Sequence, residues 1–274
     1  MAGGTCIGWP AGLRLTPVLP TASLTRVTDY TEASYGDKIA EIYDERYLES
    51  FAEDTEKAVS FLKEEAGDGP ALELGIGTGR VALPLAEAGV QVHGIDGSEA
   101  MLAKLKGKPG ADRIPVTLGS FANFSFETQF RLVYVVFNTF FGLLTQDDQV
   151  SCFQAVARHL TNDGVFVMQA FVPDVTRFDV HNQRVAAESV GIDQVALETS
   201  THDPFDQRTD SAYVVIRNDR IRLYPVRIRY AYVSELDLMA RLAGLRLRER
   251  WAGWDREPYP SRSWTHVSVW EGAT

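Results

Sequence analysis

Apolar residues recur along the chain with two different spacings, and the change of spacing divides the sequence into parts. Between residues 36 and 171, segments with apolar residues at helical spacing alternate with short, almost wholly apolar runs. The first pattern predicts amphipathic helices and the second predicts buried strands. We expect helices at 36–67 (as a pair), 79–89, 98–108 and 145–160, and strands at 70–75, 90–96, 114–119, 130–138 and 164–171. This alternation predicts a parallel sheet with helices on both faces.

A period of two replaces this pattern in the third quarter of the chain. Apolar and polar residues alternate in three segments, at 194–203, 210–219 and 221–233. Polar turn residues such as Asn218 and Asp219 separate them, which is typical of antiparallel strands. Helical spacing then returns at 234–244, and two final strands are predicted at 245–254 and 263–270.

These patterns divide the chain into four parts. Residues 1–27 are expected to be a disordered tail, and 28–192 to hold N-terminal helices and the α/β core with its parallel sheet. Residues 193–233 are expected to form an antiparallel cap over the carboxyl end of the sheet, where open α/β sheets bind ligands. Residues 234–274 complete the core sheet.

The composition limits the classes of partner. The formal net charge of −10 argues against broad binding to a phosphate backbone. No apolar run reaches transmembrane length and no signal-peptide pattern is present, so no membrane partner is expected. The two cysteines, Cys6 and Cys152, lie far apart without a CxxC pattern, which predicts no disulfide framework and no metal site. We expect a cytoplasmic protein.

The stretch LELGIGTGR, residues 72–80, carries the first chemical signal. Gly75, Gly77 and Gly79 lie between a predicted strand and a predicted helix, where a tight turn exposes helix N–H groups to a polar or anionic ligand. A nicotinamide loop would have a glycine in place of Arg80, and acidic Glu73 is foreign to that pattern. No Walker sequence is present. The plain alternative is a turn without a ligand.

A second signal is Asp96, which ends the next predicted strand in VHGIDGSEAML. A carboxylate at this place can accept hydrogen bonds from both hydroxyls of a ribose. The plain alternative is a turn or capping residue, and Ser98 is the expected N-cap of the helix that follows.

Together, the ELGxGxGR loop and this aspartate resemble the class I S-adenosylmethionine-dependent methyltransferases. Further matches are IYDERY, GSFANF, VVFNTFFGLLTQDDQ and LTNDGVFVMQAF, which resemble the small-molecule branch that modifies amino sugars, amino acids or natural products. The resemblance implies an α/β fold with a Rossmann-like, seven-stranded, mostly parallel sheet, an antiparallel last strand, and here an antiparallel β insertion after the fifth strand. It also implies S-adenosyl-L-methionine as the cofactor.

Several roles follow from the resemblance. The loop residues would lie along the methionine and ribose, Asp96 would hold the ribose, and Met101 would cover the adenine. Ser120 stands where the family often has aspartate, so its hydrogen bond to adenine would lack charge assistance. The full implied cofactor set is Glu73, Gly75, Gly77, Thr78, Gly79, Arg80, Asp96, Gly97, Met101, Ser120, Phe121 and Phe137.

The candidate catalytic residues are Tyr43, Asn138, His202 and His181. Tyr43 would close the donor pocket, Asn138 would lie beside the reacting centre, and His202, followed by His181, is the candidate base. The structural alternatives are that Tyr43, like Phe137 of the cofactor set, is a core aromatic residue and that His202 and His181 are surface residues.

The expected function is methyl transfer to an amine, hydroxyl or carbon of a small molecule in secondary metabolism. The alternatives are a nucleotide-dependent oxidoreductase and a cofactor-binding module without turnover. The insertion is also the candidate interface of a homodimer or higher homo-oligomer.

Overall fold

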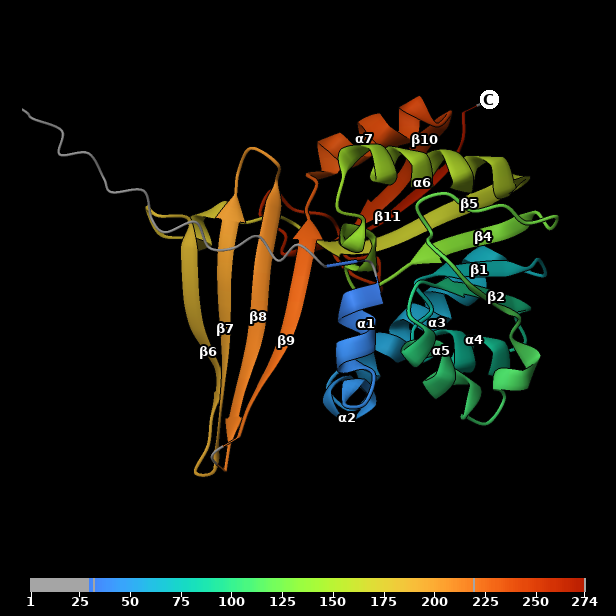
Figure 1. Cartoon of the computed structure of the whole chain (residues 1–274). Coiled ribbons are helices and arrows are strands. Elements are labelled where there is room, and N and C mark those ends of the chain that lie inside the picture. Colours follow the sequence, from blue (N-terminus) through green and yellow to red (C-terminus); the bar gives the residue numbers. More distant parts are fainter. Residues whose placement is uncertain (1–29, 32, 219, 274) are drawn as a thin grey trace, which may run out of the picture. The chain divides into compact units, whose positions relative to one another are not determined.

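The computed structural model describes residues 30–31, 33–218 and 220–273, and its main feature is a seven-stranded sheet (Figure 1). The strands lie in the order β10-β11-β5-β4-β1-β2-β3. Their bounds are β1 Ala71–Leu74, β2 Val92–Asp96, β3 Val116–Leu118, β4 Phe130–Val135, β5 Leu160–Phe171, β10 Leu245–Trp251 and β11 Thr265–Gly272. The strands β1 to β5 pair in parallel and β11 pairs antiparallel with both neighbours. The predicted Rossmann-like fold is therefore confirmed.

The strand order places a topological switch point beside β1. From β1 the chain moves outward to β2 and β3, and then returns to place β4 on the other side of β1. Ligands of open α/β sheets bind beyond the carboxyl ends of the strands at such a point. The glycine loop follows β1 and Phe137 follows β4, so both lie at this end of the sheet.

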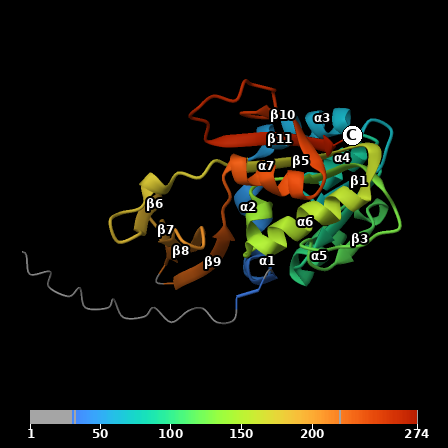
Figure 2. The same ribbon diagram turned by 90° about the horizontal axis from the view of Figure 1, so that it is seen from above.

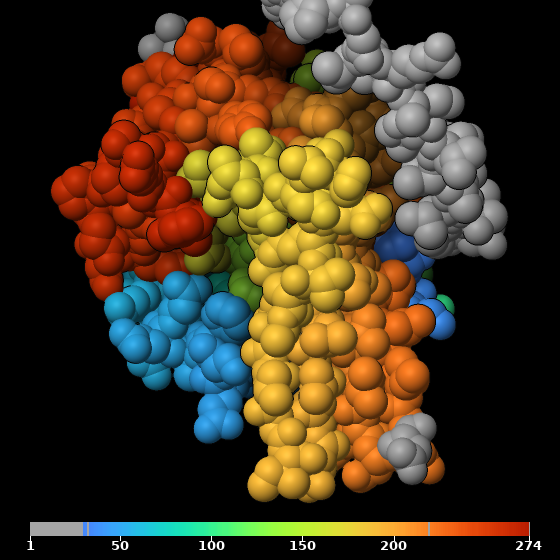
Figure 3. Space-filling model, turned by 90° about the vertical axis from the view of Figure 1, so that its left-hand side faces the viewer, coloured from blue at the N-terminus to red at the C-terminus, as the bar shows by residue number. Residues whose placement is uncertain are grey.

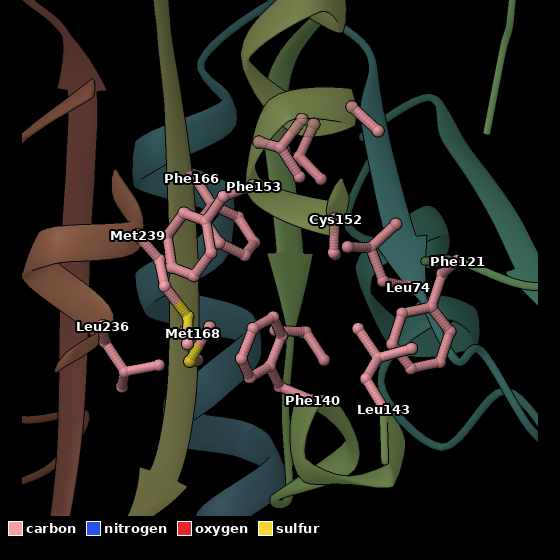
Figure 4. Packing of buried hydrophobic residues seen from close by; sticks show 14 of the residues in the cluster. Leu74, Phe121, Phe140, Leu143, Cys152, Phe153, Phe166, Met168, Leu236 and Met239 are labelled. Atoms are coloured by element: carbon pink, nitrogen blue, oxygen red, sulfur yellow. The ribbon is translucent and has the colours of Figure 1, made fainter. Parts of the chain in front are cut away.

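Helices cover both faces of the sheet (Figure 1). Their bounds are α1 Ala33–Ile39, α2 Tyr43–Tyr47, α3 Ala52–Ala66, α4 Ala82–Glu87, α5 Glu99–Lys106, α6 Gln146–His159 and α7 Val233–Leu242. Buried residues of α3, α4 and α5 form one core layer, and those of α6 and α7 form the other. In the second layer the ring centroids of Phe153 and Phe166 lie 5.2 Å apart (Figure 4).

A separate antiparallel sheet lies beside the core (Figures 1 and 2). Its strands, in order, are β6 Gln183–Val190, β7 Gln194–Asp203, β8 Arg208–Arg217 and β9 Arg220–Arg229. The strand β6 precedes the boundary at residue 193 that the sequence pattern suggests. Its sequence, QRVAAESV, does not alternate strictly because it is a mostly exposed edge strand with a bulge between Ala187 and Ser189.

One face of this sheet packs on the N-terminal helices. Tyr224 is buried in a cluster with Ile39 of α1, Tyr47 of α2 and Met101 of α5, and Tyr213 packs against the same cluster. At the carboxyl end of β9, Arg229 donates hydrogen bonds to Gln149 and Glu235 of the core helices. The insertion is therefore attached to the core at the middle and at the carboxyl end of β9.

The prediction for residues 1–27 lies outside the described residues. Within the part of the chain that is described, no helix combines the length and apolar character needed to cross a membrane.

Candidate functional site

The glycine loop follows a left-handed backbone path that only glycine adopts without strain. The φ angles are 72° at Gly75, 55° at Gly77 and 81° at Gly79. A Cβ atom at Gly75 would collide with the methyl group of Thr139, and one at Gly79 would collide with Leu105. These two glycines are therefore required by packing within the protein.

Gly77 differs from its two neighbours. A Cβ atom there would meet nothing closer than the carbonyl oxygen of Gly75, at 4.0 Å. The space in front of Gly77 is thus open, although it lies at the centre of a tightly packed loop. This is the place where a ligand can approach the backbone.

Asp96 at the end of β2 is bound to the same loop. One carboxylate oxygen accepts a hydrogen bond from the Gly77 amide at 2.7 Å, and the other accepts one from the Ser98 amide at 2.8 Å. Burial raises the pKa of Asp96, and these two amides partly oppose that change. Each oxygen keeps a second lone pair, so the carboxylate can still accept hydrogen bonds from a diol. Ser98 caps α5 by accepting from the Met101 amide, as predicted.

Glu73 lies beneath the loop. Its side chain is buried, accepts a hydrogen bond of 3.0 Å from the Tyr134 hydroxyl, and is also bonded by the backbone of Ala82 at the start of α4. Burial raises its pKa to about 8. The partners of Glu73 are thus protein groups that fix the loop and the following helix.

Arg80 is a buried cation at the edge of the loop. Its side chain donates to the Thr55 hydroxyl at 2.6 Å, and its guanidinium lies 5.0 Å from the ring centre of Phe137. Its Nε is buried without a hydrogen-bond partner. Among the described residues, no carboxylate lies within ion-pair distance of Arg80. A buried guanidinium with an unused N–H fits a bound carboxylate.

The turn after β4 lies opposite the glycines. Phe137 and Asn138 have φ angles of 55° and 65°, a conformation that is strained for residues with side chains. Gln169 of β5 accepts a hydrogen bond from the Phe137 amide, and the Asn138 side-chain oxygen accepts one from the Phe171 amide at 2.7 Å. These contacts hold the Phe137 ring between the loop and the N-terminal helices.

The short helix α2 is bound to the glycine loop through polar groups. The Thr78 hydroxyl donates to Asp44 at 2.6 Å, and Lys108 pairs with Asp44 at 2.7 Å. Tyr43 lies on the same helix, with its ring centre 4.8 Å from that of Tyr47. Tyr43 is thus adjacent in sequence to Asp44, the residue that is bonded to Thr78 of the loop.

Four residues of this region were not predicted from the sequence as site residues. Tyr35, Arg46 and Tyr47 come from α1 and α2, and Tyr213 comes from β8. The guanidinium of Arg46 lies 4.5 Å from the ring centre of Tyr213, which links α2 to the insertion. The quoted motif IYDERY contains Arg46 and Tyr47, whereas no local pattern indicates Tyr213.

The part of the site predicted to bind adenine is a groove at the protein surface. Gly97 and Ser120 line a groove of about 550 Å³ together with Asp37. Ser120 is exposed and its hydroxyl accepts from the Ala122 amide at 3.1 Å. Phe121 and Met101 are buried beside the groove, in the core and against the N-terminal helices respectively.

The two candidate histidines lie in different surroundings. His202 is buried, its Nε2 is 2.8 Å from the Tyr230 hydroxyl, and it stacks on Phe178 at 4.6 Å. His181 is exposed beside the turn at Asn182. Within the described part of the chain, no hydrogen bond or ring contact connects either histidine to the glycine loop.

Comparisons with known proteins agree with this geometry. A methyltransferase-domain family matches residues 71–164, which contain the glycine loop and Asp96. The structure is similar to that of the CcbJ methyltransferase from Streptomyces caelestis, with 40% identity and a TM-score of 0.83 over 89% of this chain and 100% of that one.

Two further relatives are similar. The cypemycin N-terminal methyltransferase of a Streptomyces species is 29% identical over 70% of this chain and 78% of its own length. An S-adenosylmethionine-dependent methyltransferase from Clostridium acetobutylicum shares the fold, at 14% identity, with a TM-score of 0.71 over 86% of this chain and 98% of that one.

The residues present fit S-adenosylmethionine, since the open space at Gly77 admits a ligand and the unused Arg80 Nε suits its carboxylate. Given the 40% identity over a complete methyltransferase and the matching domain, this chain belongs to the S-adenosylmethionine-dependent methyltransferases.

Proposed function

We propose that this enzyme transfers the methyl group of S-adenosylmethionine to an amine nitrogen of a small natural product. The observation that carries the proposal is the joined unit of Gly77 and Asp96, with open space in front of the glycine. The similarity to a methyltransferase that, by its name, acts on the N-terminus of cypemycin supports nitrogen as the acceptor atom.

Separate residues bind separate parts of the cofactor in this proposal. Asp96 accepts hydrogen bonds from the ribose hydroxyls, and the guanidinium of Arg80 binds the methionine carboxylate. Gly77 leaves room for the part of the cofactor that lies between the ribose and the carboxylate. Gly97 and Ser120, which line the groove, are assigned to the adenine side, together with the buried residues Met101 and Phe121. Glu73 acts indirectly, because its contacts are with Tyr134 and α4.

The acceptor site is proposed to lie among tyrosines of the N-terminal helices and the insertion. Burial raises the pKa of Tyr35 and Tyr43, and that of Tyr213 to about 12. These hydroxyls therefore stay protonated at neutral pH and offer hydrogen bonds instead of a basic charge. A neutral amine already has a free electron pair, so a site without a strong base suits it better than an alcohol.

The proposed mechanism rests mainly on alignment. The bound cofactor supplies an activated methyl group on a sulfonium centre. Phe137 and Tyr43 restrict the space at that centre and exclude water, and Asn138 keeps the turn in place through its bond to the Phe171 amide. Tyr213 and the rest of the insertion would select the acceptor. The proton that the methylated amine loses passes to solvent.

The class of acceptor, the compartment and the assembly are also part of the proposal. The acidic composition favours a small-molecule acceptor over a nucleic acid. We also propose the cytoplasm as the compartment and a homo-oligomer as the assembly, which the exposed aliphatic side chains of the insertion, such as Val190, Ile221 and Leu223, support.

Incubation with methyl-labelled cofactor tests the proposal. The purified chain would be offered matched sets of small amines, alcohols and carbon acids, and labelled products would be located by fragmentation mass spectrometry. We expect label on nitrogen, lost in the Gly77→Val variant. Label on oxygen or carbon alone would overturn the acceptor assignment. Hydride transfer with nicotinamide cofactors and no methyl transfer would overturn the function itself.

A further inference from the structure

Tyrosine side chains surround the half-buried Arg46 of α2. The guanidinium of Arg46 lies 4.5 Å from the ring centre of Tyr213 on β8 and 5.5 Å from that of Tyr47. The ring centre of Tyr43 is 4.8 Å from that of Tyr47. The guanidinium of Arg46 and the hydroxyl of Tyr35 on α1 both interact with the Tyr47 hydroxyl. These five residues form the tyrosine–arginine cluster, to which α1, α2 and the insertion all contribute.

The positive charge of Arg46 is not neutralised by a carboxylate of the described residues, and the side chains that act on it most strongly are tyrosines. Asp44, on the same helix, pairs with Lys108 instead. Glu198, which lies directly across the strand pair from Tyr213, pairs with two other arginines. The chain has a formal net charge of −10, so this unpaired cation is not part of a generally positive surface.

The cluster offers hydrogen-bond donors and contains no negatively charged acceptor. A guanidinium can only donate. Burial raises the pKa of Tyr35, Tyr43 and Tyr213, so their hydroxyls stay protonated at neutral pH and can donate as well. Donors around an unpaired arginine fit a carboxylate, whose two oxygens match the planar fork of the guanidinium. A second ammonium group would be repelled there.

The cluster lies beside the turn at which methyl transfer is proposed. The ring centre of Tyr47 is 5.4 Å from that of Phe137, and Arg80 lies against another side of Phe137. Figure 3 shows a recess between the blue N-terminal helices and the gold strands of the insertion, with green atoms of the core at its bottom. A molecule in this recess can therefore place one end near Phe137 and the other at Arg46.

We propose that the acceptor is an amino carboxylate and that Arg46 binds its carboxylate with help from the tyrosine hydroxyls. This inference rests on the proposed function, because it concerns the acceptor of the methyl group. The contact at Arg46 directs the amine toward the methyl group beside Phe137. Two arginines then serve two different carboxylates, with Arg80 assigned to the cofactor and Arg46 to the acceptor. Amines without an acidic group lose the contact at Arg46.

Acceptors of matched length test the proposal. The purified chain would be offered methyl-labelled cofactor with straight-chain ω-amino carboxylic acids of increasing length, each beside its own primary amide. We expect at least one acid to exceed its amide about tenfold to a hundredfold in kcat/KM, the effect of one charge-assisted hydrogen-bonded contact. Equal values within every pair would overturn the carboxylate site.

Binding without turnover separates this inference from the proposed function. The same pairs would be titrated by calorimetry into the complex with S-adenosylhomocysteine. An absence of methyl transfer to nitrogen overturns the proposed function, whereas the preference for acid over amide in binding tests Arg46 alone. If no acid binds more tightly than its amide, or if no acid binds at all, the carboxylate site is wrong.

Substitutions assign the preference to Arg46. Arg46→Met should remove the preference for the acid, and Arg46→Lys should keep part of it because the charge remains. The matched control is Arg184→Met, on the same face of the insertion, whose parent charge is paired with Glu198. Affinity for S-adenosylhomocysteine should change little in Arg46→Met. A parallel loss of that affinity, or a preference that survives in Arg46→Met, would overturn the assignment.

Discussion

The backbone amide of Gly77 donates a hydrogen bond of 2.7 Å to the carboxylate of Asp96. This contact joins the middle of the glycine loop to the end of β2. The same carboxylate accepts from the Ser98 amide at the start of α5. Loop, strand and helix thus share one acceptor, so a substitution of Asp96 changes the contacts of all three.

Asp96→Ala should weaken binding of the cofactor and of its demethylated product about tenfold to a hundredfold. The reason is the loss of charge-assisted hydrogen bonds of about 1.5–3 kcal/mol. Calorimetry measures the change, with Asp112→Ala as an exposed control. Because burial raises the pKa of Asp96, affinity in the wild type should fall at a higher pH on acidification than for an ordinary aspartate. Unchanged affinity in Asp96→Ala would remove this residue from the site.

Gly77→Ala should weaken cofactor binding at least tenfold while the protein stays folded. The added methyl group would occupy the open space that we assign to the ligand. Gly89 is the matched control, because its φ is 99° and a Cβ atom there also meets nothing within 4 Å. Both alanine variants should lose about 1 kcal/mol of stability, and only Gly77→Ala should lose affinity. Equal affinity in the two variants would make the loop structural only.

Much of this site follows from local sequence. Gly77 and Asp96 could be predicted because each belongs to a short sequence pattern. Both patterns fall within the continuous segment from β1 through α4 to β2. Tyr213 was not, since it reaches α2 from a strand far along the chain, and only tertiary packing brings it there. The sequence pattern did not predict β6, because a bulge interrupts the alternation of apolar and polar residues in this exposed edge strand. His202 looked like a candidate base from its turn-like surroundings, but its partners, Phe178 and Tyr230, come from distant segments.

Arg80→Met should reduce affinity for S-adenosylhomocysteine about tenfold to a hundredfold, through the loss of a bond between its guanidinium and the carboxylate. Affinity for methylthioadenosine, which has no carboxylate, should change little. Calorimetry with both ligands separates this role from a general effect on folding, and Arg113→Met is an exposed control. Parallel losses for the two ligands would mean that Arg80 supports the site without contacting the carboxylate.

Glu73 should make the protein less stable as the pH rises. Its pKa is raised to about 8 in the folded state, well above the ordinary value, so the folded chain holds a proton that the unfolded chain loses. Stability from this group is complete below about pH 4 and is lost as the pH rises toward 8, with a slope of up to about 1.4 kcal/mol per pH unit. Urea unfolding between pH 5 and 8 should show a flatter profile for Glu73→Gln. Parallel profiles would contradict the raised pKa.

Neither His202→Ala nor His181→Ala should slow the chemical step by more than about threefold. His202 is held by Tyr230 and Phe178, and burial lowers its pKa, so it is neutral but faces other protein groups. His181 is exposed beside the turn before β6. Loss of a true general base would cost about 10²–10⁴ in rate. Single-turnover measurements with saturating cofactor distinguish these outcomes, and His202→Ala should be less stable because a buried hydrogen bond is lost. Two near-normal rates would leave alignment by Phe137, Tyr43 and Asn138 as the source of catalysis. A hundredfold loss of rate in either variant would instead identify that histidine as the base and favour an acceptor that must be deprotonated.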